Sequence, residues 1–95
     1  MKLPVEITPD TQPIYEFVIQ LLEEKGAVPA PEAVLAYPYL KNGHIDSLAF
    51  IKFIFRIEER FVIQFSEADI LNVRIRTVGG LIDLIAEKSN QARNA

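Results

Sequence analysis

Apolar residues recur every three or four positions in three separate stretches of this chain, at about residues 13–25, 47–61 and 77–88. That spacing lines one face of an α-helix with apolar side chains, because successive helical residues are rotated by about 100°. A short additional helix is predicted at residues 66–71. The pattern therefore predicts an all-α fold, a small four-helix bundle of three main helices, one short helix and a long first loop. The 95 residues suffice for a single domain, residues 1–95.

The first helix is predicted to follow an irregular lead-in at residues 1–10. Thr11 is its predicted N-cap, because a hydroxyl there can accept a hydrogen bond from the first turn. Pro13 is tolerated in that turn, where its missing N–H costs no hydrogen bond. Gly26 is placed to end the helix. The predicted core face consists of Ile14, Phe17, Val18, Leu21 and Leu22.

The connection over residues 26–45 has no helical periodicity and contains several prolines. Long connections without secondary structure are uncommon in compact domains and are usually functional. One turn of helix is predicted at residues 31–35. The rest of the loop is expected to be ordered, because apolar side chains along it can anchor it to the core. These anchors are Tyr37, Tyr39 and Leu40.

The second main helix, predicted at residues 47–61 with Asp46 as its N-cap, has two separated apolar stripes. One stripe forms a core face, and the other lies roughly 130° away and either packs on another neighbour or is exposed. The core face is Phe50, Phe53, Ile54, Ile57 and Phe61, the polar face is Ala49, Lys52, Arg56, Glu59 and Arg60, and the second stripe is Leu48, Ile51, Phe55 and Val62. Within the second stripe, Val62 is assigned to the core.

Capping signals mark the two remaining helices. Ser66 and Asp69 have the spacing of a capping box, which predicts the short helix. Thr77 is predicted to cap the last main helix. The pair of glycines that follows it, Gly79 and Gly80, weakens the first turn but permits close packing.

The chain turns polar at residues 89–95 and is expected to fray there. The core of the single domain is therefore predicted to span about residues 11–88. The predicted core face of the last helix is Val78, Leu81, Ile82 and Ile85, with Leu84 at its edge.

Composition and charge exclude several classes of function. The chain has 10 basic and 13 acidic side chains and a net charge of −3, which argues against nucleic acid, since its binders need a basic patch. Because cysteine is absent from the sequence, disulfides, a cysteine nucleophile and a cysteine metal site are excluded, and a reducing compartment, the cytoplasm, is predicted. Neither a membrane span nor a signal peptide is predicted. We expect a monomer.

Side chains suited to catalysis are few. His44, Asp46 and Ser47 are almost consecutive, whereas a catalytic triad needs side chains that converge from different parts of a chain. The sequence has no cluster of histidines or cysteines that could hold a metal ion. The chain is therefore expected not to be an enzyme. Ser47 is still of interest, because the positive end of a helix and its unpaired N–H groups favour a phosphate attached to a first-turn hydroxyl.

The residues around Ser47 resemble the phosphopantetheine-attachment motif of acyl carrier proteins. The resemblance lies in Gly43-His44-Ile45-Asp46-Ser47-Leu48, which stands between the long loop and the second main helix. Downstream segments are also similar to this family. They follow in the same order as the helices that periodicity predicts. The match covers about residues 13–88. These segments are residues 57–61, 62–67 and 77–82.

The resemblance implies a fold of the acyl-carrier type and a carrier function. Ser47 would bear a 4'-phosphopantetheine arm, transferred from coenzyme A by a separate magnesium-dependent phosphopantetheinyl transferase. The arm would hold an acyl group as a thioester and present it to enzymes of fatty acid biosynthesis or related lipid metabolism. Asp46 would cap the helix and help to position the transferase's magnesium. The implied partner-docking residues are Leu48, Ile51, Lys52, Phe55, Glu58 and Glu59.

Departures from the family point to a specialised member. Typical bacterial fatty-acid carriers are strongly acidic, and their second helix presents carboxylates to basic patches on enzymes. Here Ala49 and Lys52 stand at positions that are usually acidic, and only Glu58 and Glu59 keep the expected sign. We therefore predict a dedicated set of partners. The cargo is expected to be short or held outside the bundle, because four side chains can fill the space for a long chain: Phe50, Phe53, Phe61 and Phe65.

Two alternatives remain open. Within the carrier class, the chain could be an aminoacyl or peptidyl carrier that loads an amino acid such as D-alanine. Outside it, the chain could be a small helical interaction module whose Ser47 is never modified and whose second stripe docks a partner helix. For Leu48, Ile51 and Phe55, the alternative to docking is packing beneath the long loop.

Overall fold

The structure is a computed structural model that describes the backbone of residues 9–94 and the side chains of residues 9–91. This part of the chain contains five α-helices and one 3₁₀ helix. No strand occurs in that part, so the predicted all-α fold is confirmed. Most of the predicted lead-in, and residue 95, lie outside the described residues. The elements are α1 (Gln12–Glu23), α2 (Pro31–Val34), α3 (Ser47–Phe61), α4 (Glu67–Leu71), the 3₁₀ helix η1 (Val73–Arg76) and α5 (Val78–Asn94).

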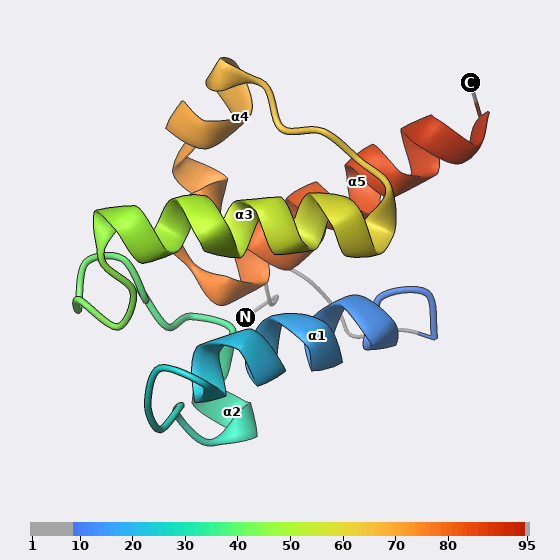
Figure 1. Ribbon diagram of the computed structural model, residues 1–95. Coiled ribbons are helices and arrows are strands. Elements are labelled where there is room, and N and C mark those ends of the chain that lie inside the picture. Colours follow the sequence, from blue (N-terminus) through green and yellow to red (C-terminus); the bar gives the residue numbers. More distant parts are fainter. Residues whose placement is uncertain (1–8, 95) are drawn as a thin grey trace.

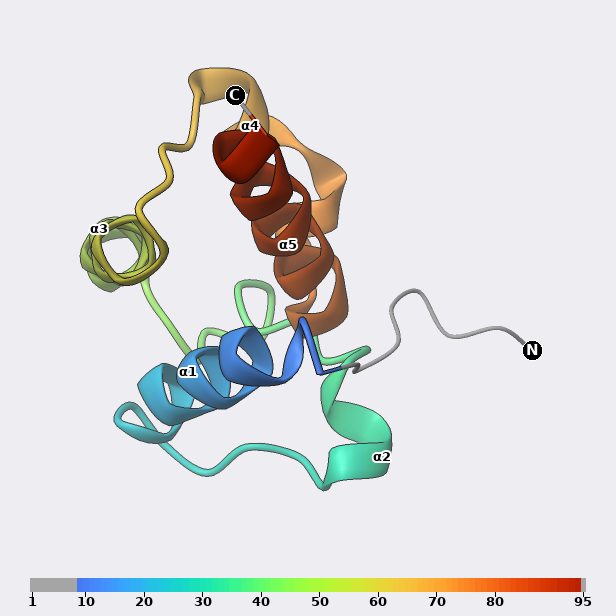
Figure 2. The ribbon, with the colours of Figure 1, turned by 90° about the vertical axis from the view of Figure 1, so that its right-hand side faces the viewer.

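The three long helices, α1, α3 and α5, surround one apolar interior (Figures 1 and 2). Seen along α3 in Figure 2, α1 lies below this interior, α5 rises beside it, and α2 lies beneath α1. The amphipathic patterns predict these faces correctly, because each helix buries the stripe expected of it. Buried side chains include Ile14, Val18, Leu21 and Leu22 of α1, Phe53, Ile54 and Ile57 of α3, and Val78, Leu81, Ile82, Leu84 and Ile85 of α5.

Helix α1 begins and ends where local signals place it. Thr11 occupies the N-cap position, where its carbonyl accepts a 2.9 Å hydrogen bond from the Tyr15 N–H, although its side chain makes no capping bond. The helix ends at Glu23, and Gly26 then takes a φ of 151°, a conformation that side-chain-bearing residues rarely adopt. The chain can therefore turn back beneath α1 into the long loop.

The long loop is held to the core and to the start of α5. Tyr39 is fully buried, its hydroxyl donates to the Ile75 carbonyl, and burial raises the pKa of that hydroxyl. The Gly79 N–H donates to the Leu35 carbonyl at 2.8 Å, and Tyr37 and Leu40 pack against the core as partly buried side chains. The predicted anchors are confirmed, as is the single turn of helix, α2.

The first turn of α5 contacts the preceding 3₁₀ helix closely. A Cβ atom at Gly80 would overlap the backbone carbonyl of Arg74, so the expected close packing is confirmed at this glycine. Thr77 caps the helix as predicted, with its Oγ1 accepting from the Gly80 N–H at 3.1 Å. The 3₁₀ helix η1 was not predicted, because a single turn has no apolar periodicity.

Two details of the sequence-based prediction are wrong, the end of the last helix and the burial of Val62. Helix α5 continues to Asn94 rather than ending near residue 88, and residues 89–94 contain no proline or glycine that would break it. Val62, assigned to the core, is 82% exposed. It adopts a left-handed conformation (φ 55°, ψ 52°) that ends α3, so a helical stripe cannot be extended through it.

Candidate functional site

Ser47 is the first residue of α3 and is exposed to solvent. Asp46 before it is the N-cap, as predicted, and its Oδ1 accepts a 2.8 Å hydrogen bond from the Ala49 N–H. The Ala49 N–H is thereby paired, while those of Ser47 and Leu48 have no acceptor within the helix. An accessible hydroxyl therefore lies beside two backbone donors at the positive end of a 15-residue helix.

His44 fixes the loop that leads into this helix. Its Nδ1 lies 2.8 Å from the Tyr37 hydroxyl, and its Nε2 lies 2.7 Å from the Leu22 carbonyl oxygen. A carbonyl only accepts, so Nε2 donates to Leu22, while Nδ1 forms the hydrogen bond with the Tyr37 hydroxyl. The ring thus joins the loop to the end of α1, three residues before Ser47. Both ring nitrogens are engaged away from Ser47 and Asp46, an arrangement unlike a catalytic triad.

Sequence reasoning missed this clamp of Tyr37, His44 and the Leu22 carbonyl. Its two bonds join residues 7 and 22 positions apart. No helical spacing relates them, and one of the partners is a backbone atom. A single histidine in a long loop that also contains Tyr37 and Tyr39 was the only available signal, and it does not identify a partner on α1.

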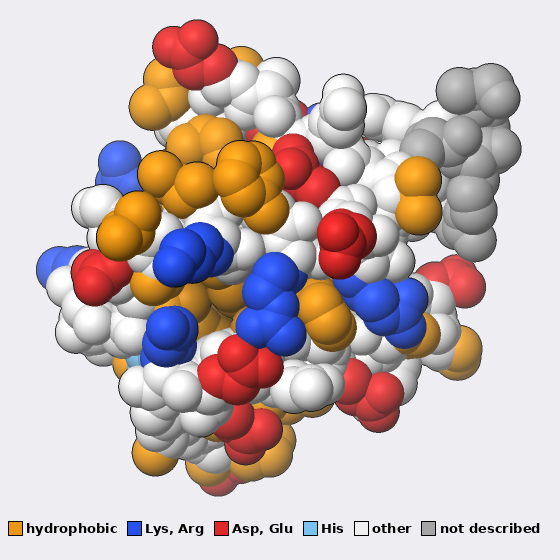
Figure 3. All heavy atoms as spheres, in the orientation of Figure 1, with side chains coloured by type: hydrophobic (Ala, Val, Ile, Leu, Met, Phe, Trp, Pro, Cys, Tyr) orange, Lys and Arg blue, Asp and Glu red, His pale blue; other side chains and the backbone are white. Residues whose placement is uncertain are grey.

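Three members of the predicted second stripe lie on the solvent-exposed surface of α3, and they are Leu48, Ile51 and Phe55. We call these three residues the exposed row. Their side chains are 67%, 51% and 63% exposed. Packing beneath the long loop is therefore excluded for them. Figure 3 shows apolar side chains on this side of α3 and on α4 beyond it. Isolated exposed apolar residues are ordinary, but a row of three large ones beside Ser47 is a candidate interface.

The charged residues near the exposed row differ in what they contact. Glu58 accepts a 2.8 Å hydrogen bond from the Phe65 N–H and so holds the loop after α3. Arg56 pairs at 2.7 Å with Glu24, the C-cap residue after α1, which raises the pKa of Arg56 and lowers the pKa of Glu24. Lys52 takes part in none of the ion pairs found among residues 9–91, and it and Glu59 are exposed. Lys52 is therefore available to a partner, whereas Glu58 is partly committed to the fold.

An apolar groove of about 220 Å³ lies between α3 and α4 beside the exposed row. Phe50 and Phe65 line it, together with Ile54 and Ile70. The other two phenylalanines expected to fill this space lie elsewhere. Phe53 is buried against Tyr39, with ring centroids 5.7 Å apart, and Phe61 packs edge-on against Phe17 of α1 at 5.6 Å. Only two of the four phenylalanines therefore line this groove.

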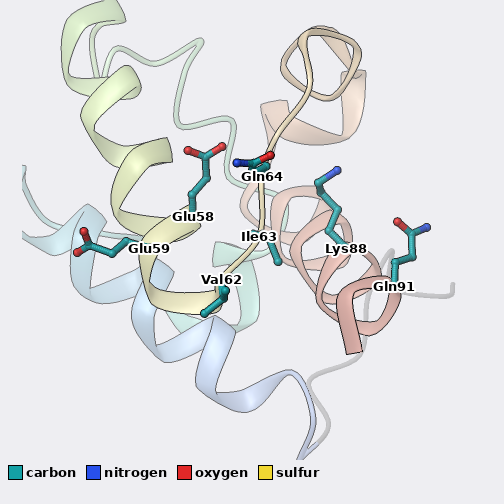
Figure 4. Close-up of a pocket in the computed structure, with 7 residues that line it drawn as sticks. All are labelled: Glu58, Glu59, Val62, Ile63, Gln64, Lys88 and Gln91. Carbon is teal, nitrogen blue, oxygen red and sulfur yellow. The ribbon is translucent and has the colours of Figure 1, made fainter. Parts of the chain in front are cut away.

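A wider hollow of about 600 Å³ lies between the C-terminal end of α3 and α5 (Figure 4). Glu58, Glu59, Lys88 and Gln91 line it, and Lys88 is already paired with Asp69 at 2.6 Å. The helical rise separates this end of α3 from Ser47 by roughly 20 Å. The hollow is therefore not part of the site at Ser47.

Neither a cluster of metal-ligating side chains nor a membrane-spanning helix is found within residues 9–94. Among these residues, no three histidine or acidic side chains are grouped as metal ligands would be. Nor does any helix there combine the length and apolar character needed to cross a bilayer.

Comparisons with protein-family models, with curated proteins and with solved structures find no match for this chain. The resemblance of residues 43–48 to a carrier motif therefore rests on the chain's own residues. The candidate site is the exposed Ser47 with its capped helix start, its anchored loop and the exposed row next to it.

Proposed function

We propose that this chain is an acyl carrier protein that bears 4'-phosphopantetheine on Ser47, within a fold of the acyl-carrier type. The observation that carries the proposal is the exposed hydroxyl of Ser47 at the first residue of α3, within the motif of residues 43–48. Ser47 needs no catalytic neighbours in this role, because a separate transferase supplies the base. The engagement of His44 with Tyr37 and Leu22 is compatible with it.

The modification is a phosphoryl transfer from coenzyme A. Ser47 Oγ forms a bond to the β-phosphorus of coenzyme A as the bond from that phosphorus to the bridging pyrophosphate oxygen breaks. Adenosine 3',5'-bisphosphate leaves, and the hydroxyl proton passes to the transferase's base. The product is a phosphodiester, and the bound arm supplies the thiol on which an acyl group travels as a thioester.

The residues at the start of α3 suit a phosphodiester. The N–H groups of Ser47 and Leu48 have no intrahelical acceptor, and the helix dipole favours a negative charge there. Asp46 uses Oδ1 for the cap, which leaves Oδ2 to contact the magnesium held by the transferase. These residues orient the attachment point, while the exposed row beside it docks the transferase and the enzymes that load and unload the arm.

The size of the apolar groove supports a short cargo. Its volume of about 220 Å³ is below the roughly 300–1,000 Å³ of typical ligand pockets. Phe50 and Phe65 occupy part of the space between α3 and α4. We therefore propose a short acyl group, or one held outside the bundle, and a dedicated set of partner enzymes.

Intact-mass measurement tests the carrier proposal directly. The purified protein is incubated with coenzyme A, magnesium and a broad-specificity phosphopantetheinyl transferase, next to a carrier known to be modified. The mass is expected to rise by one phosphopantetheinyl group, and Ser47→Ala is expected to abolish the rise. An unchanged mass, with the control carrier modified, would overturn the proposal. A rise that survives Ser47→Ala would move the attachment site elsewhere.

A second candidate function is an interaction module that is never modified. The observation that favours it is the exposed row, which is available for docking whether or not Ser47 carries an arm.

An aminoacyl or peptidyl carrier gives the same mass result as an acyl carrier. It is distinguished by loading, since an adenylating enzyme would then attach an amino acid to the arm.

A further inference from the structure

We infer that the partner surface which meets this chain beside Ser47 is acidic, with carboxylates placed around an apolar recess. The inference deepens the proposed carrier function and rests on it, since it specifies the chemistry of the enzymes that dock there. It follows from the charges that the fold leaves free around the exposed row. Acidic fatty-acid carriers meet basic patches on their enzymes, so the partner surface inferred here has the opposite charge.

Basic side chains line the side of α3 that faces α1. Lys52 and Arg56 lie one turn apart, about 8 and 14 Å along the helix from Ser47. Both border an open groove of about 340 Å³ between the two helices, and Lys25 lies at its α1 side. Figure 3 shows basic side chains in a row across this face of the molecule, beside the patch of apolar side chains. A partner seated on the exposed row therefore meets this row along one edge.

The acidic groups near this row are largely used within the fold. Glu24 is paired with Arg56, and the Asp46 carboxylate accepts the capping hydrogen bond from the Ala49 N–H. Lys25 and Lys52 take part in none of the ion pairs among the described side chains. Glu59 is exposed, but it lies two turns beyond Lys52 towards the far end of α3. The charged side chains that line this groove are three basic ones, Lys25, Lys52 and Arg56, and two acidic ones, Glu24 and Asp46, so the groove has an excess of one positive charge, although the whole chain carries −3.

Charge complementarity selects a protein partner over an anionic membrane. A protein can place carboxylates opposite Lys52 and leave neutral groups opposite Glu59, which fixes register and excludes wrong partners. A lipid surface carries negative charge everywhere and would repel both Glu59 and the net negative chain. The exposed row also spans only about two turns of α3, which is small for a surface that must enter a bilayer.

Binding of two synthetic helical peptides tests the inference on the unmodified protein. The peptides share the same leucines at positions i, i+3, i+4 and i+7, and they differ only in flanking residues, all glutamate in one and all lysine in the other. Amide chemical shifts of ¹⁵N-labelled protein report the binding site and the Kd. We expect the glutamate peptide to shift the amide signals of residues 48–56, and we expect its affinity to fall with added salt. We expect the lysine peptide to bind at least about tenfold more weakly.

Two matched charge reversals identify the responsible residue. Lys52→Glu is expected to weaken binding of the glutamate peptide about tenfold. Arg76→Glu makes the same change in charge on η1, which Figure 2 places on the opposite side of the molecule from α3, and is expected to leave the Kd unchanged. Neither side chain takes part in an ion pair among the described residues, so both variants should fold.

Several results would overturn the inference. These are binding of neither peptide to α3, equal or tighter binding of the lysine peptide, an equal effect of the two charge reversals, or docking of α3 on phosphatidylserine vesicles. The mass measurement on Ser47 separates this failure from failure of the carrier proposal. A modified Ser47 with no peptide binding refutes only the acidic partner, whereas peptide binding to an unmodifiable protein favours the interaction module.

Discussion

The clamp of Tyr37, His44 and the Leu22 carbonyl predicts a stability loss that can be worked out from the structure. His44→Ala removes two hydrogen bonds, of 2.8 and 2.7 Å, each with a net contribution of about 0.5–1.5 kcal/mol. The Leu22 carbonyl keeps a 2.9 Å bond from the Lys25 N–H, and the half-buried Tyr37 hydroxyl can turn to water. No buried group is left unpaired, so the expected loss is about 2 kcal/mol.

That loss corresponds to a fall in Tm of about 10 °C for a domain of this size. Thermal and urea unfolding followed by far-UV circular dichroism measure it. Tyr37→Phe removes only the hydroxyl and is expected to cost about 1 kcal/mol. Because both changes remove the same hydrogen bond, the double variant should be more stable than the sum of the two losses predicts, by about 1 kcal/mol.

A tyrosine on α1 provides the control. Tyr15 is half-buried and has no hydrogen bond from its hydroxyl among the described interactions, so Tyr15→Phe should change stability by less than about 0.5 kcal/mol. Strict additivity of His44→Ala and Tyr37→Phe would refute the hydrogen bond between them. A fall in Tm of less than about 2 °C for His44→Ala would refute the clamp as a whole.

Three further predictions concern positions outside the site. Val62→Gly should stabilise the protein by about 1 kcal/mol in urea unfolding, because glycine adopts the left-handed conformation without strain; destabilisation would contradict this account of how α3 ends. Gly80→Ala should destabilise it by about 1–3 kcal/mol despite alanine's helix propensity, because the new Cβ meets the Arg74 carbonyl; a higher Tm would show that the two turns can separate. The pKa of Asp69 is lowered from 3.8 by Lys88 and the Ser66 N–H, so its contribution is present above about pH 4 and lost as pH falls further. Asp69→Asn should therefore lower stability at pH 7 and flatten its decline between about pH 5 and 2, and an unchanged pH profile would contradict the pairing.

The helices and their starts follow from local sequence. Helix α3 runs from Ser47 to Phe61 with Asp46 as its cap, as the sequence predicts, and the Ser66–Asp69 capping box forms with both of its hydrogen bonds. These signals are predictable because the donor and acceptor lie within three residues of each other. The position of the candidate site at the start of α3 is predictable for the same reason.

Predictions fail where a pattern is extended past the end of an element. The stripe of Leu48, Ile51 and Phe55 does not continue to Val62, because the backbone leaves the helical conformation there. Helix α5 extends beyond the residue at which the chain turns polar, because a polar segment without proline or glycine can continue a helix. Periodicity describes residues inside a helix and does not determine where the helix stops.

The sequence by itself determined the helical class, the amphipathic faces, the side-chain caps of α3, α4 and α5, and the location of Ser47 at a helix start. Only the tertiary structure decided that the second apolar stripe is exposed, that Glu24 pairs with Arg56, and that His44 holds the loop to α1. The physical reason is the range of the interactions involved. Caps and helical faces depend on neighbours within a turn, whereas the exposure of Leu48 and the freedom of Lys52 depend on which distant residues the fold brings alongside α3.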